Sequence, residues 1–189
     1  MQSGAVQAAY RRNLELAQRE DFADLMIAEI KVRDARRVRV HVSGDFFSAA
    51  YTQQWVKIAR ASPQTVFLAY TRSWRDAAVW PVLRRWSRLR NARLWLSWDR
   101  DMAVPPKGRT WRRCFLSTAG EDPARGTPDL VFRDRRDPLL KFTANGAMVC
   151  PYEQGTAVST QLTCERCQLC LRTKALPRQK PTLTLTTSQ

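Results

Sequence analysis

The sequence predicts an α/β protein with a parallel sheet or partial barrel, flanking helices and a cysteine-rich metal-binding segment near its C-terminal end. Between residues 38 and 98, three strand-like stretches alternate with two amphipathic helical stretches. This order is typical of parallel strands joined by right-handed crossovers. Four of the five cysteines lie between Cys150 and Cys170. A chain of 189 residues with 44% hydrophobic content can bury one core, so we expect a single domain over residues 1–176.

Two helices are expected before the first strand, over residues 3–18 and 21–32. Asp21 lies where a side chain can cap the first turn of the second helix. The apolar residues of that helix recur at helical spacing and form one stripe: Phe22, Leu25, Met26 and Ile30. A helix with such a stripe is expected to dock on a sheet.

Three strands are expected at residues 38–43, 65–70 and 92–98. The first alternates, with Val38, Val40 and Val42 on one face and polar residues on the other. The second is nearly continuous in apolar residues, as in a strand that is covered on both faces.

The helices between these strands are marked by their caps and stripes. Ser48 can cap the first, which ends before Pro63, and Pro81 suits the first position of the second. Their buried stripes are Tyr51, Trp55, Ile58 and Ala59 in the first, and Val82, Leu83, Trp86 and Leu89 in the second.

The pattern loses its regularity after residue 99. Residues 130–132 suit a short strand, and residues 139–143 and 147–150 flank Asn145-Gly146. That dipeptide favours a two-residue hairpin turn, which would deliver Cys150 to a metal. The threonine- and proline-containing tail, residues 177–189, is expected to be disordered.

The cysteine spacing indicates a metal centre in segment 147–172. Cys164, Cys167 and Cys170 are each two residues apart, and Cys150-Pro151 is the natural fourth ligand. A 4Fe-4S cluster needs four thiolates, and a ferredoxin-type loop supplies three of them at this spacing. Zinc is the alternative, although zinc sites built from four thiolates more often use two separated pairs, and disulfides or unliganded thiols are the third interpretation. Cys114 lies outside this spacing and is expected to be a buried thiol.

The formal net charge of +15, from 32 basic and 17 acidic residues, predicts a polyanionic partner, and nucleic acid is the obvious one. The alternative is an arginine-rich surface that reflects a GC-rich genome. Tryptophans near the arginines could stack on bases, or could belong to the core: Trp74, Trp80, Trp86, Trp95 and Trp98. Neither a secretion signal nor an apolar run of membrane-spanning length is seen, so we expect a soluble, cytoplasmic protein whose cysteines are ligands rather than disulfides.

Polar residues follow each predicted strand, where parallel sheets bind ligands. The candidate catalytic residues are His41, Asp45, Tyr70, Arg72 and Asp99. Ser43, Gly44 and Asp45 are candidates for binding a cofactor, because the glycine lets a ligand approach the backbone. Each candidate also has a structural alternative. His41 could be a hydrogen-bonded core residue, and Asp45 and Asp99 could be turn or cap residues. Tyr70 and Arg72 could simply pack at the end of their strand.

Several of these motifs occur together in one family. The chain carries His41 to Phe46 (His-Val-Ser-Gly-Asp-Phe), Ala69 to Ser73 (Ala-Tyr-Thr-Arg-Ser), Ser97 to Asp99 (Ser-Trp-Asp) and the Cys150 to Cys170 segment. With Tyr51 and Trp55, this combination resembles the gene-product-eighty-eight-like proteins of phages and plasmids over about Tyr10 to Cys170. The resemblance implies a mobile-element protein and brings no mechanism with it.

A more distant similarity is to radical S-adenosylmethionine enzymes, which are partial α/β barrels. It implies that Ser43-Gly44-Asp45 holds the amino group of S-adenosylmethionine. Those enzymes carry a cysteine triplet after their first strand, whereas this chain has no cysteine before Cys114. Three hypotheses follow: an iron–sulfur protein associated with nucleic acid, a truncated or degenerate radical-type enzyme, and a zinc-stapled nucleic-acid-binding module. Whether the chain is an enzyme stays open among them.

Overall fold

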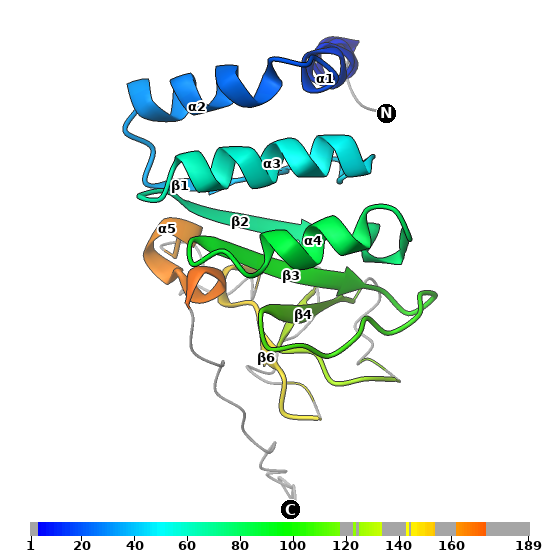
Figure 1. Ribbon diagram of the computed structural model, residues 1–189. Coiled ribbons are helices and arrows are strands. Elements are labelled where there is room, and N and C mark those ends of the chain that lie inside the picture. The colour runs from blue at the N-terminus through cyan, green and yellow to red at the C-terminus, as the bar shows by residue number, and fades with distance from the viewer. Residues whose placement is uncertain are drawn as a thin grey trace, which may run out of the picture. The chain divides into compact units, whose positions relative to one another are not determined.

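The computed structural model (Figure 1) describes residues 4–117, 123, 125–133, 143, 145–153 and 162–172. The chain forms two compact units, residues 1–94 and 95–189. The expected single domain over residues 1–176 stays a prediction, and the expected disordered tail, residues 177–189, lies outside the described residues.

The α/β class and the parallel sheet are confirmed. Among the described residues the sheet has six strands, in the order in which they occur along the chain. They are β1 (Arg37–Arg39), β2 (Val66–Thr71), β3 (Ala92–Trp98), β4 (Trp111–Leu116), β5 (Leu130–Phe132) and β6 (Met148–Val149). The pairs β1–β2, β4–β5 and β5–β6 are parallel. The metal-binding character of the cysteine-rich segment stays a prediction.

Four α-helices belong to the first unit, as predicted: α1 (Gly4–Ala17), α2 (Phe22–Val32), α3 (Ala49–Ala61) and α4 (Trp80–Trp86). The 3-10 helix η1 (Ser73–Arg75) lies between β2 and α4. Figure 1 shows α2 and α3 side by side, and α3 also packs against α4. Ser48 caps α3 as expected, since its hydroxyl accepts the backbone N–H of Tyr51 at 3.1 Å.

The predicted cap of α2 is wrong. The side chain of Asp21 makes no capping hydrogen bond, because its two oxygens accept from the Arg19 guanidinium at 2.7 and 2.6 Å. The predicted stripe of α2 is only partly buried: Ile30 is buried, whereas Leu25 is 49% exposed.

Strand β1 is shorter than predicted, and its valine face does not extend to Val42. Pairing with β2 runs from Arg37↔Val66 to Arg39↔Leu68. After Val40 the chain leaves the sheet, and Val42 is 83% exposed. The half-buried ring of His41 instead packs against Phe46, with ring centroids 4.7 Å apart. The alternating pattern therefore predicted burial of Val42, whereas the structure packs His41 into an aromatic cluster instead.

Most tryptophans belong to the core. Trp86, Trp95 and Trp98 are among the largest fully buried side chains, so base stacking is the wrong interpretation for these three. Val82 and Leu83 of α4 are buried as predicted. Cys114, in β4, is 1% exposed, which confirms the expected buried thiol.

In the second unit, three strands lead to the cysteine-rich segment. Cys114 of β4 lies opposite Leu130 of β5, which lies opposite Met148 of β6. A turn precedes β6 at the predicted place, but the bond that closes it, from the Thr143 N–H to the Ala147 carbonyl at 2.8 Å, has three residues between its ends rather than the predicted two. The first arm of the predicted hairpin, residues 139–142, lies outside the described residues. Three short helices follow: η2 (Pro151–Glu153), α5 (Cys164–Cys167) and η3 (Leu169–Leu171).

Candidate metal centre and strand-end cluster

Cys164, Cys167 and Cys170 lie on a tight helical loop made by α5 and η3. Thr163 caps α5, since its hydroxyl accepts the backbone N–H of Arg166 at 3.3 Å. Gln168 then adopts the left-handed conformation, with φ of 52°. This residue reverses the chain between the second and third cysteine. Cys164 is exposed, and the other two are half-buried.

Cys150 reaches the same region from the sheet. It follows β6, where its backbone N–H donates to the Val131 carbonyl at 2.7 Å, and it is buried. The pKa of the Cys150 thiol is raised to about 12, mainly by burial and in smaller part by the charges of Glu153 and Cys170. Helix η2, directly after Cys150, packs against α5. The two ends of the cysteine segment therefore meet.

Strands β3 and β4 support the last cysteine. The indole N–H of Trp95 donates to the Cys170 carbonyl at 3.0 Å. The Arg112 guanidinium carbon lies 5.3 Å from the centre of the Trp95 ring. Burial lowers the pKa of Arg112, while the negative charges of Asp129 and Cys170 act to raise it. Arg112 and Trp95 thus give the Cys170 turn one positive charge and one hydrogen-bond donor.

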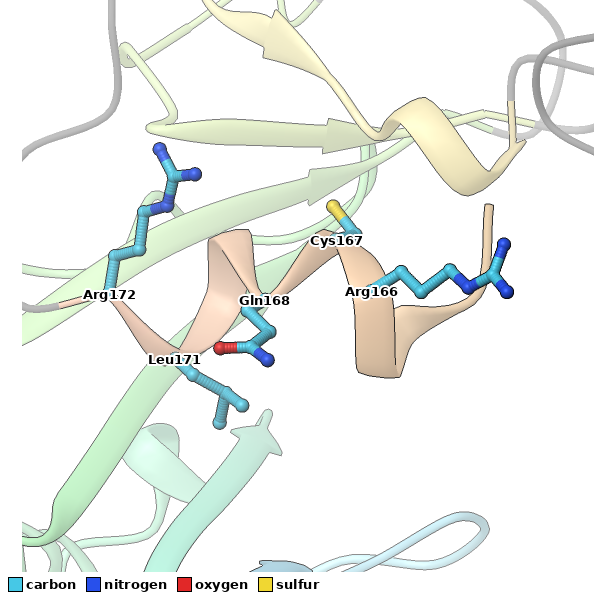
Figure 2. A pocket seen from close by; sticks show the side chains of 5 residues that line it. All are labelled: Arg166, Cys167, Gln168, Leu171 and Arg172. Atoms are coloured by element: carbon cyan, nitrogen blue, oxygen red, sulfur yellow. The ribbon is translucent and has the colours of Figure 1, made fainter. Parts of the chain in front are cut away.

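The described residues do not contain a finished metal site, because no group of three or more His, Cys, Asp or Glu side chains among them is arranged to hold a metal ion. The loop instead borders a pocket of about 360 Å³, lined by Arg166, Cys167, Gln168, Leu171 and Arg172. In Figure 2 the side chains of Gln168 and Leu171 point to one side of the loop and the Cys167 sulfur to the other.

In the first unit, Asp45 joins the loop after β1 to the end of β2. One carboxylate oxygen accepts from the Thr71 hydroxyl at 2.6 Å, and the other accepts from the Arg72 backbone N–H at 2.6 Å. The Phe46 backbone N–H adds a third donor at 2.8 Å. The amino group of S-adenosylmethionine would have to compete with these donors for Asp45.

Ser43 and Gly44, the other candidate cofactor-binding residues, are exposed. Gly44 has φ of +84°, and a Cβ added there would meet nothing within 4 Å. Glycine is therefore favoured at this position because of its backbone conformation, and not because another group approaches it closely.

His41 lies in an aromatic cluster. Its Nε2 is 3.1 Å from the Tyr51 hydroxyl, and its ring packs against Phe46. Nδ1 is buried and has no hydrogen-bond partner among the described residues. Burial lowers the pKa of His41, and the nearby charge of Asp45 acts to raise it. The Tyr51 contact fits the hydrogen-bonded alternative for His41, and its catalytic role stays a prediction.

The remaining candidates have local partners. The Arg39 guanidinium carbon lies 5.4 Å from the centre of the Tyr70 ring, and Arg72 contributes its backbone N–H to Asp45. Asp99 belongs to the second unit, where its carboxylate accepts from the Asp101 backbone N–H at 3.2 Å. That contact fits the turn role considered for Asp99.

Sequence reasoning missed the roles of Trp95 and Arg112. Both lie in strands, where periodicity indicates burial but does not identify a partner. No pattern marks a tryptophan that will bond to a carbonyl 75 residues away.

The sheet and the cysteine-bearing loop define an α/β protein with a C-terminal cysteine-rich segment. The family model described as "Gene product 88" matches residues 2–173, so the chain belongs to this family. It is 36% identical to the Gene 88 protein of Mycobacterium phage L5 over 108 residues, covering 51% of this chain and 44% of that relative. The chain thus spans less than half the length of this curated relative.

No solved structure matches the chain. The similarity to radical S-adenosylmethionine enzymes has no support from these comparisons. Within the described part of the chain, none of the helices is both long and apolar enough to cross a membrane.

Proposed function

We propose that this member of the Gene product 88 family binds a 4Fe-4S cluster through Cys150, Cys164, Cys167 and Cys170. The observation that carries the proposal is the meeting of the two ends of the cysteine segment. Helix α5 packs against η2, and the charge of Cys170 acts on the Cys150 thiol.

The donor set suits an iron–sulfur cluster better than zinc. All four proposed ligands are thiols, three of them on one tight loop, which is the ferredoxin-type arrangement. Zinc with four thiolates usually binds two separated pairs. A bound cluster would supply electron transfer or would staple the segment. Metal ligation would contribute folding free energy to this loop, in which Cys164 is exposed and Cys167 and Cys170 are half-buried.

The polypeptide would contribute three supports of its own. Thr163 caps the short helix that carries Cys164 and Cys167. Trp95 holds the carbonyl of Cys170. The half-buried Arg112 places a positive charge near that cysteine, which would stabilise its thiolate and partly offset the negative charge of a thiolate-ligated cluster.

The test is anaerobic purification followed by metal and sulfide analysis. We expect about four iron and about four acid-labile sulfide per chain after reconstitution. About one zinc without sulfide would instead establish the zinc-stapled alternative. Protein that takes up neither metal under these conditions would overturn both.

We also propose that the protein associates with nucleic acid, because its net charge of +15 favours phosphate neutralisation with release of counterions. Affinity should then fall steeply as salt is added. Absence of binding to single- and double-stranded DNA and RNA, or binding that salt does not change, would contradict this association.

A further inference from the structure

One segment of the first unit combines many arginines with almost no acidic residue. Between Phe46 and Trp98 the chain has nine basic residues, and Asp76 is its only acidic residue. Five of the nine are exposed arginines at the ends of α3 and α4 and in the turn after α4: Arg60, Arg84, Arg85, Arg88 and Arg90. We call these five the arginine surface.

The fold gathers the arginine surface at one end of the first unit. Helix α3 leads into β2 and α4 leads into β3, so both helices end near the amino ends of their strands (Figure 1). The side-chain amide of Asn91 donates to the carbonyls of Ala59 and Ser62, at 2.9 and 3.0 Å. This amide ties the turn after α4 to the end of α3.

Positive charge on this surface is not neutralised by partners. Among the described residues, none of the five arginines forms an ion pair, and Arg85 donates to the neutral Gln53 amide at 2.7 Å. Other arginines of the first unit are paired, as Arg33 is with Glu29 and Arg36 with Asp34. The five arginines of this surface therefore keep their charge, although they are not alone in this, since Arg11 and Arg12 of α1 are also exposed and form no ion pair with a carboxylate among the described residues.

Helix electrostatics account for only part of this arrangement. Basic residues in the last turn of a helix complement its dipole, which explains Arg60, Arg84 and Arg85. Arg88 and Arg90 lie beyond the end of α4, where the dipole contributes little. An external anion is the partner that all five would share.

We propose that the arginine surface binds the phosphate backbone of a double-stranded nucleic acid. Guanidinium groups bind phosphate oxygens through paired hydrogen bonds. The only aromatic residue of this segment at the end of α4, Trp86, is fully buried, so it offers no platform for stacking unpaired bases. Backbone contact without base contact positions a duplex and carries little sequence preference.

The composition of the surface favours a nucleic acid over a membrane. Interfacial membrane binding combines basic residues with exposed apolar residues. In the described part of the chain, the exposed large hydrophobic residues do not include any from α4 or the turn after it. The arginine surface offers charge without an apolar anchor.

The inference rests on the proposed association with nucleic acid, and the experiment separates the two. The variant R84Q/R88Q/R90Q and the control R19Q/R33Q/R36Q each remove three positive charges from the net +15. The control arginines are exposed and paired with carboxylates. Binding to a 20-base-pair duplex of random sequence would be measured by fluorescence anisotropy across a salt series, with circular dichroism as the check of folding.

For R84Q/R88Q/R90Q we expect weaker binding, and a salt slope smaller in magnitude by about 0.9 for each arginine that contacts a phosphate. The control variant should keep most of the affinity and most of the salt slope of the original chain. If the original chain binds the duplex and the two variants lose the same amount of affinity, the proposed role of the arginine surface is overturned, while the association with nucleic acid stands. No binding by the original chain overturns both.

Parallel measurements at the same salt test the kind of partner. The single strand, vesicles containing phosphatidylserine and poly-glutamate should each bind more weakly than the duplex. Equal or tighter binding of the single strand would overturn the duplex preference. Tighter binding of the vesicles or of poly-glutamate, with the same loss in R84Q/R88Q/R90Q, would assign the surface to a membrane or to an acidic protein instead.

Discussion

Trp95 donates its indole N–H to the carbonyl of Cys170, 75 residues further along the chain, at 3.0 Å. The bond joins a buried strand to the turn that carries the last of four clustered cysteines. Through this bond the core of the second unit holds one end of the proposed metal-binding loop.

Replacing Trp95 by phenylalanine should loosen this turn. The change keeps an aromatic ring but removes the donor to Cys170, a loss of about 1 kcal/mol for a neutral hydrogen bond, plus the cost of the smaller ring. After reconstitution we expect faster loss of iron to a chelator than in the original chain.

The control is Trp98→Phe, the same change in the same strand at a ring that packs against Phe115. Equal rates of iron loss in the two variants would show that the hydrogen bond to Cys170 has no separate effect.

Cys167→Ala should remove a proposed ligand from the middle of the loop. We expect the visible absorbance of the reconstituted protein and the folded structure around α5 to be lost together, because ligation contributes folding free energy. Absorbance spectra and hydrogen exchange would measure the two losses.

Cys114→Ala is the matched change, since Cys114 lies in β4 and outside the C-x2-C-x2-C spacing of the proposed ligands. This variant should keep the iron content of the original chain. Unchanged iron and sulfide in Cys167→Ala would exclude Cys167 as a ligand.

Asp45→Asn should destabilise the first unit. The carboxylate of Asp45 joins the chain after β1 to Thr71 and Arg72, and hydrogen bonds to a charged group are worth about 1.5–3 kcal/mol. The amide keeps one acceptor oxygen, so we expect a loss of about 1–3 kcal/mol in urea unfolding.

Asp99→Asn is the comparison, because the Asp99 carboxylate accepts from a backbone N–H only two residues away. A loss at Asp45 no larger than the loss at Asp99 would contradict a structural role for the link between the two strand ends.

His41 should make stability depend on pH below its ordinary pKa. Burial lowers the pKa of His41 from 6.5 in the folded state, so the unfolded chain binds a proton more readily. Stability from neutral His41 is therefore present above about pH 6.5 and is lost as pH falls through the lower folded pKa. Asp45 opposes this shift by favouring the charged ring.

Since His41 is the only histidine, its ring signals in an NMR titration report this pKa directly. His41→Gln should flatten the stability profile between the two pKa values. A folded-state pKa at or above 6.5 would contradict the expected effect of burial.

Periodicity was enough to predict the helices and strands whose apolar residues repeat over several turns or along a whole strand. Strand β2 lies within one residue of its predicted bounds, although only one of its faces is fully buried. Helix α4 buries Val82, Leu83 and Trp86 as predicted, whereas Leu89 lies beyond its end and is half-buried.

The end of β1 was predicted wrongly because alternation records only polarity. Val42 is more apolar than His41, yet the ring of His41 packs against Phe46 and Tyr51. This packing involves residues that follow the strand, so the alternation within the strand cannot predict it.

The sequence by itself determined the α/β class, the charge and the spacing of the four cysteines, because these depend on residue type and on neighbours along the chain. The tertiary structure alone decided that Asp45 bonds to the end of β2, that Trp95 holds Cys170, and that unpaired arginines of α3 and α4 gather at one end. Each of these contacts joins segments distant in sequence, and only the packing of strands and helices brings such segments within hydrogen-bond or Coulombic range.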